Sequence, residues 1–149
     1  MTLDSSLATL IAGDFPSVRL RAPDGAHAQI YLYGGHVTSW NTPDSRERLF
    51  MSRRAEFRPG ASLRGGVPVI FPQFAGLGPL LKHGFARVSP WEYQGADANS
   101  AGVTARFRLT ATDDTRRQSV QFALSRHRTP LLAAAGIAVL ATLLAARSR

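Results

Sequence analysis

The chain has 149 residues, of which 44% are hydrophobic, with 13 glycines and 9 prolines. This size and composition are ordinary for one loop-rich globular domain with its own core. The chain has no cysteine, which excludes a disulfide framework, a thiolate metal site and a cysteine nucleophile. Because a cysteine-free chain fits a reducing compartment, we expect a cytoplasmic protein. The N-terminus carries Asp4 and Asp14 and no basic region before an apolar core, so we expect no secretory signal.

The net charge of +8 is unevenly distributed along the chain. Residues 1–114 contain 12 basic and 10 acidic side chains, whereas residues 115–149 contain six arginines and no acidic side chain. Clustered basic residues drive nucleic-acid binding by neutralising phosphates. Here the excess belongs to the tail, and arginine outnumbers lysine 17 to 1, which indicates coding bias. We therefore expect no nucleic-acid partner.

Short runs of alternating or clustered apolar residues predict antiparallel strands. The residues between these runs are typical of tight turns, as in Pro23-Asp24-Gly25 and Gly34-Gly35. In the run 103–110, apolar residues occupy the odd positions and polar residues the even positions, so one face is predicted to be buried. An all-β, antiparallel fold follows. The predicted strands cover residues 17–20, 28–33, 37–40, 48–52, 89–94 and 103–110.

Residues 115–149 form a tail without this alternation. Within it, residues 131–146 are apolar apart from Gly136 and Thr142. A helix over this stretch would be about 24 Å long, whereas a bilayer core requires about 20 residues, so a tail-anchored membrane helix is a less favoured alternative to a short helix. A truncated or out-of-frame translation of a GC-rich gene fits the composition best, because acidic residues disappear while Arg, Ala and Leu increase.

Two segments gather charged side chains around turn residues. Arg64 precedes Gly65-Gly66 in the run 63–74, and Lys82-His83-Gly84-Phe85-Ala86-Arg87 follows shortly after. An arginine is a permanently charged planar fork that suits phosphate or carboxylate, and a histidine exchanges a proton near neutral pH. Together the two segments predict a site for a small anionic ligand.

Other candidate sites are not supported by the sequence. The four histidines show no ligand spacing and have no paired carboxylates, so we predict no metal site. Gly65-Gly66 followed by Gly76 and Gly78 has no strand-helix-strand context, so we predict no nucleotide cofactor. His27 and His36 are interpreted as structural or exposed.

The two charged segments resemble the aldose 1-epimerase-like superfamily, in particular the hexose-6-phosphate mutarotases, or glucose-6-phosphate 1-epimerases. Members carry R-G-G-[IV]-P-x-x-[FW]-P-x-F-G followed by H-G-[FL]-A-R-x-x-x-W-E, and residues 34–40 are similar to their G-[AG]-x-V-x-S-W turn. The resemblance covers roughly residues 15–113, about half of the family's length. It implies that residues 1–114 are the N-terminal part of an antiparallel β-sandwich of the galactose mutarotase-like type, with residues 115–149 as a tail without family match.

The resemblance also implies the site and the reaction. Arg64 and Arg87 would bind the phosphate of a hexose 6-phosphate, and His83 would line the sugar pocket. Lys82 is a weaker candidate, because related mutarotases often have glutamine there. The implied reaction interconverts the α and β anomers of glucose 6-phosphate or a related hexose 6-phosphate and needs one base and one acid. In the family these are a glutamate and a histidine from the second half, and Glu56 matches neither by motif, so we expect this chain to be inactive.

Two other functions remain open at this point. The chain could be a non-catalytic β module that binds a sugar phosphate, or a small membrane protein anchored through residues 131–146. Strand edges that the second half of the family domain would cover also predict self-association, because an unpaired edge offers N–H and C=O groups to another chain.

Overall fold

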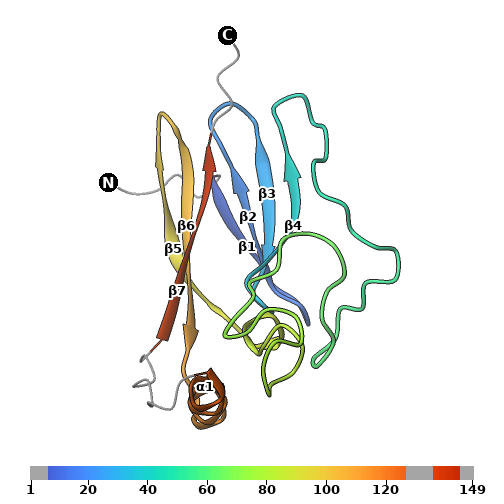
Figure 1. The fold of residues 1–149 in the computed structure, drawn as a ribbon. Coiled ribbons are helices and arrows are strands. Elements are labelled where there is room, and N and C mark those ends of the chain that lie inside the picture. The colour runs from blue at the N-terminus through green and yellow to red at the C-terminus, as the bar shows by residue number, and fades with distance from the viewer. Residues whose placement is uncertain (1–6, 127–135, 145–149) are drawn as a thin grey trace.

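Two antiparallel sheets form the body of the protein in the computed structural model, which describes residues 7–126 and 136–144 (Figure 1). The first sheet has the strand order β1-β2-β3-β4 and the second has the order β5-β6-β7. The predicted antiparallel, sheet-rich fold is confirmed. The first sheet contains β1 (Ala8–Ile11), β2 (Ser17–Arg21), β3 (His27–Tyr31) and β4 (His36–Asn41); the second contains β5 (Glu92–Asn99), β6 (Gly102–Thr110) and β7 (Gly136–Leu144); the helices are η1 (Ala86–Val88), a 3₁₀ turn, and α1 (Asp113–Arg126).

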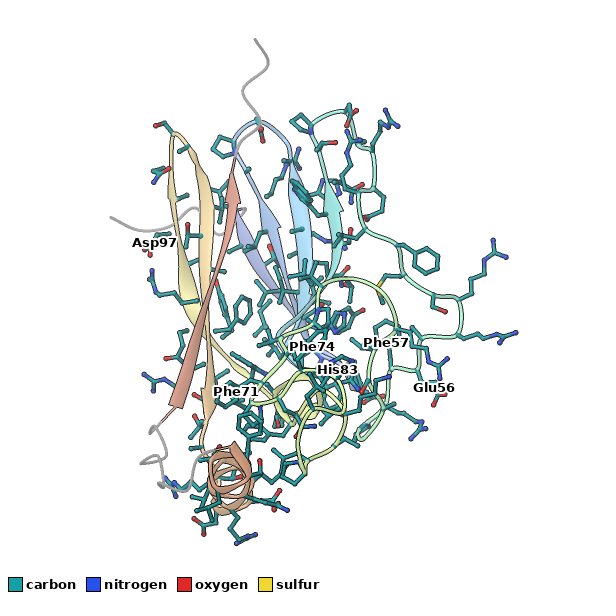
Figure 2. The ribbon with its side chains drawn as sticks, viewed as in Figure 1. Glu56, Phe57, Phe71, Phe74, His83 and Asp97 are labelled. Carbon is teal, nitrogen blue, oxygen red and sulfur yellow. The ribbon has the colours of Figure 1, made fainter. Side chains whose placement is uncertain are left out.

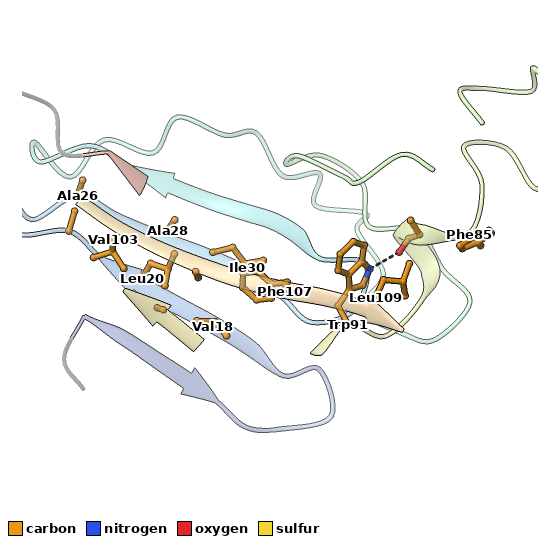
Figure 3. Packing of buried hydrophobic residues seen from close by; sticks show 14 residues of the cluster. Val18, Leu20, Ala26, Ala28, Ile30, Phe85, Trp91, Val103, Phe107 and Leu109 are labelled. Atoms are coloured by element: carbon orange, nitrogen blue, oxygen red, sulfur yellow. Dashed lines mark hydrogen bonds between the residues drawn. The ribbon is translucent and has the colours of Figure 1, made fainter. Parts of the chain in front are cut away.

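The core lies between the two sheets, which face each other (Figure 1). In β6 every second residue from Val103 to Leu109 is buried, as the alternation predicts. These side chains belong to one cluster with Val18 and Leu20 of β2 and Ile30 of β3 (Figure 3). Burying a side chain of this size contributes about 1.5–3 kcal/mol relative to leaving it exposed. The core therefore holds the sheets together and fixes which strand faces point outward.

The β3–β4 hairpin is tied to the segment that precedes β5. The Gly34 N–H donates to the Ser89 carbonyl at 2.8 Å, and the Trp91 N–H donates to the Leu32 carbonyl at 2.8 Å. The buried Trp91 ring donates its Nε1–H to the Ala86 carbonyl at 2.9 Å (Figure 3). The segment before β5 is thereby held against the first sheet.

The predicted strand at residues 48–52 is wrong. The structure has only isolated β-bridges here, at Glu47 and Met51. The Glu47 carboxylate accepts hydrogen bonds from the backbone N–H of Arg48 at 3.0 Å and of Leu49 at 2.8 Å. The Arg48 N–H also donates to the Trp40 carbonyl of β4 at 2.8 Å, whereas the Ser52 N–H donates to the Arg64 carbonyl at 3.0 Å. The segment therefore changes partner between its two bridges and forms no continuous strand.

Strand β5 begins and ends later than the predicted strand at residues 89–94. Pro90 has no N–H to donate. Ser89 caps the C-terminal end of η1, because its N–H donates to the carbonyl of Ala86, the first residue of η1. The strand therefore begins at Glu92 and continues to Asn99.

Helix α1 occupies the place where the sequence predicted only the start of a tail. Thr112 caps it, because its Oγ1 accepts the Thr115 N–H at 3.2 Å while the Thr112 N–H donates to Thr115 Oγ1 at 2.8 Å. Asp113 and Asp114 lie in the first turn, where the helix dipole favours carboxylates. The run Thr-Asp-Asp-Thr is thus a helix start that the prediction overlooked.

The predicted helix at residues 131–146 is wrong for the part that the structure describes. Gly136–Leu144 is strand β7, which pairs with β6 over its whole length, and the rest of the predicted helix lies outside the described residues. The run includes the β-branched residues Ile137, Val139 and Thr142, and pairing with β6 outweighs the helix propensity of its Ala and Leu residues. Among the described residues, no helix has the length and apolar character needed to cross a membrane.

Glu47 gives the fold a pH-dependent contribution. Burial by itself raises the pKa of this carboxyl, but hydrogen bonds from Ser39, Trp40, Leu49 and Asn41 outweigh it and lower the pKa from 4.5 to about 2. A carboxyl whose folded-state pKa is lowered stabilises the fold above its unfolded-state pKa and loses that contribution as the pH falls through the folded-state value.

We expect the variant Glu47→Gln to melt below the wild type at pH 7, and we expect this difference to shrink as the pH falls from 4.5 to 2. Thermal melting followed by circular dichroism measures both. Glu92→Gln, which removes an exposed carboxylate from β5, is the control and should show a smaller difference at pH 7. A Glu47→Gln difference that stays constant over this pH range would contradict the assignment.

Candidate functional site

A cavity of about 740 Å³ lies in the long connection between β4 and β5. The structure brings all four predicted substrate-binding residues, Arg64, Lys82, His83 and Arg87, to its wall. Their binding of a sugar phosphate stays a prediction. The wall is completed by Glu56, Arg58, Ala61, Ser62, Leu63, Gly65, Gly66 and Pro68.

The turn that carries Arg64 depends on its two glycines. Gly65 has φ +98° and Gly66 has φ +61°, in the left-handed region that favours glycine. A Cβ on Gly66 would collide with the carbonyl oxygen of Val37 and would lie 2.9 Å from Nε2 of His36. The absence of a side chain at Gly66 therefore lets the turn pack directly against β4.

His36 lies at the start of β4, next to this turn. Its side chain is 1% exposed, and its Nε2 lies 2.7 Å from the Gly65 carbonyl oxygen. Burial lowers the pKa of His36, the hydrogen bond to Gly65 raises it in part, and the charge of Arg87 lowers it further. The buried imidazole is therefore neutral near neutral pH, and the interpretation of His36 as structural agrees with this position.

His83 is held in the cavity wall by two hydrogen bonds to Ala75. Its backbone N–H donates to the Ala75 carbonyl at 2.8 Å, and its Nδ1 accepts the Ala75 N–H at 3.0 Å. A backbone N–H can only donate, so the neutral ring carries its proton on Nε2. The ring meets Phe74 edge to face with centroids 5.3 Å apart (Figure 2). Burial and the charges of Arg87 and Lys82 lower the pKa of His83, so it offers a neutral N–H donor to a ligand.

Arg87 lies within η1 and is only partly satisfied. Its Nη2 donates to the Lys82 carbonyl at 3.1 Å, whereas its buried Nε has no hydrogen-bond partner among the described residues. Burial lowers the pKa of Arg87, but a guanidinium remains charged at ordinary pH. Because an unsatisfied buried donor is costly, an acceptor supplied by a ligand would be favoured here.

The cavity wall is positively charged. The ion pairs among residues 7–126 and 136–144 do not include Arg64, Lys82 or Arg87. The carboxylate of the wall, Glu56, is paired with Arg58 at 2.6 Å. Unpaired cationic side chains that line a concave surface attract anions. The same described residues contain no group of three or more His, Asp or Glu side chains that could hold a metal ion.

Sequence reasoning missed the wall formed by Glu56 and Arg58. Between them, Phe57 packs against Phe15 with ring centroids 5.9 Å apart and against Tyr31 with centroids 5.0 Å apart. The residues on either side of this packed aromatic ring, Glu56 and Arg58, line the cavity; Figure 2 labels Glu56 and Phe57. The charged-aromatic-charged run is the signal that could have indicated this wall.

Gln73 was also missed, although it orders the loop on which His83 rests. It is 1% exposed, its Nε2 donates to the carbonyls of Ala75 and Leu80 at 3.2 and 3.1 Å, and its Oε1 accepts the Leu80 N–H at 2.9 Å. The surrounding residues 67–74 form no named strand, as their prolines predict. A single buried glutamine gives no signal in the sequence, because its partners are all backbone groups.

A second concave surface, with a volume of about 430 Å³, lies on the outer face of the first sheet. Arg19 and Arg21 of β2, His27 and Gln29 of β3 and Ser39 of β4 line it. It shares no residue with the first cavity and none with the two charged segments at 63–74 and 82–87. It therefore provides matched arginines for control variants.

Residues 16–129 match the family model for aldose 1-epimerase. The chain belongs to the aldose 1-epimerase family. A protein of Escherichia coli named "Putative glucose-6-phosphate 1-epimerase" is 36% identical over 110 residues, which are 72% of this chain. A protein of the same name from Cenchrus ciliaris is 49% identical over 74 residues, which are 50% of this chain.

A solved structure supports the same family. The crystal structure of a protein from Salmonella typhimurium described as a "putative mutarotase" aligns with 78% of this chain at a TM-score of 0.67 and 29% identity. The predicted mutarotase-like β-sandwich is therefore confirmed.

The matches differ in how much of each protein they cover. The chain spans 35% of the Escherichia coli protein, 22% of the Cenchrus ciliaris protein and 40% of the Salmonella typhimurium chain. The family match continues past residue 114 to residue 129, and the predicted division of the chain at residue 114 stays a prediction.

We expect Gly66→Ala to lower the free energy of unfolding by at least about 1–2 kcal/mol, because a side chain in left-handed backbone is strained and this one also meets β4. Urea unfolding followed by tryptophan fluorescence measures the change. Gly76→Ala is the control, since a Cβ there meets nothing within 4 Å, and we expect a change within about 0.5 kcal/mol. Equal effects of the two substitutions would contradict the close packing of the Arg64 turn on β4.

Proposed function

We propose that this chain binds a hexose 6-phosphate, glucose 6-phosphate in particular, in the cavity lined by Arg64, Lys82, His83 and Arg87. The observation that carries the proposal is that two motif segments, separate in the sequence, place these side chains around one cavity. The names of the curated relatives support the choice of ligand. In the proposal, the guanidinium groups bind the phosphate through charge-assisted hydrogen bonds, and His83 donates from Nε2 to a sugar oxygen.

The corresponding activity of a whole family member would be interconversion of the two anomers. This reaction removes a proton from the anomeric hydroxyl while a proton is delivered to the ring oxygen, so it needs a base and an acid. We propose that this chain binds without turnover. The described cavity supports this, because its carboxylate Glu56 is engaged by Arg58 and its imidazole is His83 alone. The resemblance likewise assigns the base and the acid to other residues.

Cytoplasmic location and self-association belong to the same proposal. Strands β1 and β5 each pair on one side only within the described sheets, and such edges favour association. The truncated or out-of-frame origin of the chain stays a prediction that translation of the coding DNA in all frames tests.

Glucose 6-phosphate binding, measured by isothermal titration calorimetry, tests the site. We expect Arg64→Ala and Arg87→Ala each to weaken binding about 10- to 100-fold, because a hydrogen bond to a charged group contributes about 1.5–3 kcal/mol. We expect glucose to bind far more weakly than its 6-phosphate. Arg19→Ala, in the second concave surface, is the matched control and should leave binding unchanged. Weaker binding in the control but not in Arg64→Ala would show that the proposal places the phosphate in the wrong cavity.

Exchange between the anomers of glucose 6-phosphate, followed by NMR with stoichiometric protein, tests the absence of turnover. We expect the wild-type chain to leave the exchange rate unchanged. An acceleration that disappears in His83→Ala would show that His83 transfers a proton, and the proposal of binding without turnover would fall.

A further inference from the structure

His36 makes a single specific hydrogen bond from a fully buried position. Its Nε2 lies 2.7 Å from the carbonyl oxygen of Gly65, the residue directly after Arg64. A carbonyl only accepts, so Nε2 carries the proton, and Nδ1 of the neutral ring is a bare acceptor. Nδ1 is buried and has no partner among the described residues. The ring orientation therefore depends on its bond to Gly65.

The backbone bonds of the Arg64 turn leave the Gly65 carbonyl to His36. The Gly66 N–H donates to the Phe50 carbonyl at 2.8 Å, and the Arg64 carbonyl accepts the Ser52 N–H at 3.0 Å. Neither bond uses the Gly65 carbonyl oxygen, which is the partner of His36. The peptide plane between Gly65 and Gly66 is thus held at both ends, its N–H by the Phe50 carbonyl and its C=O by the imidazole of His36, at a place where two glycines otherwise allow several conformations.

His36 also lies within electrostatic reach of the second predicted phosphate ligand. The positive charge of Arg87 disfavours protonation of the His36 ring, and so does burial; both lower its pKa. A neutral ring adds no repulsion against the arginines of the cavity, whereas a lysine or a protonated histidine at this position would.

We propose that His36 is the positioning residue of the phosphate site: through its Nε2–H bond to the Gly65 carbonyl it fixes the direction in which Arg64 enters the cavity, next to Arg87. The ligand named here rests on the proposed function. His36 does not touch the ligand, and its effect passes through the turn.

Three variants test this role. His36→Gln keeps an N–H donor at the distance of Nε2, whereas His36→Leu removes the donor and keeps an apolar side chain of similar size. Leu20→Ala, in the core between the sheets, is the control for lost stability away from the cavity. We expect the glucose 6-phosphate Kd to stay within about threefold of wild type in His36→Gln and in Leu20→Ala, and to rise about tenfold or more in His36→Leu.

Backbone order of the turn gives a readout that does not need a ligand. We expect the ¹⁵N order parameters of Gly65 and Gly66 to fall in His36→Leu and to be retained in His36→Gln. If the wild-type chain binds no glucose 6-phosphate, the proposed function fails, and these order parameters alone decide the role of His36.

The proposal is overturned by either of two results. One is a His36→Leu variant with wild-type Kd and wild-type order at Gly65 and Gly66. The other is a Leu20→Ala variant that weakens binding as much as His36→Leu does, which would reduce the role of His36 to general stability.

Discussion

The cavity depends on backbone hydrogen bonds that tie two loops to the β3–β4 hairpin. Val37 of β4 and Val67 exchange both of their N–H···O bonds, at 3.1 and 2.8 Å, and this fixes the segment that follows the Arg64 turn. On the other side of the hairpin, the bond from Gly34 to Ser89 fixes the segment that follows Arg87. One hairpin therefore fixes the positions of the two loop segments that carry Arg64 and Arg87.

The charge of the cavity comes from arginine and lysine side chains and not from its histidines. The pKa of His36 is lowered mainly by burial, and the pKa of His83 is lowered by burial and by neighbouring cations. Both imidazoles are therefore neutral where an unperturbed histidine would begin to protonate. The positive field is left to the side chains of Arg64, Lys82 and Arg87. Its attraction for an anion thus varies little across the physiological pH range, apart from the titration of the ligand itself.

Local sequence patterns predicted the parts of this structure that depend on local chemistry. The alternation at 103–110 gave the buried face of β6, and the two motif segments indicated four residues that the structure brings together at one cavity. Contacts between residues that are distant in the sequence could not be predicted from local patterns. The strand predicted at 48–52 is absent because the segment changes partner from Trp40 of β4 to the Arg64 turn. The predicted helix at 131–146 includes β7 because β6 offers it an edge.

The wall of Glu56 and Arg58 was missed for the same reason, since Phe57 finds its partners Phe15 and Tyr31 far away in the sequence. That wall is attached to the sheet by packing of aromatic rings, whereas the Arg64 turn is attached by backbone bonds. Substitutions at positions 56 and 58 can therefore change the charge and size of one side of the cavity while the arginines on the other side keep their geometry. Within one cavity, the side that carries Glu56 and Arg58 can thus evolve independently of the side that carries Arg64 and Arg87.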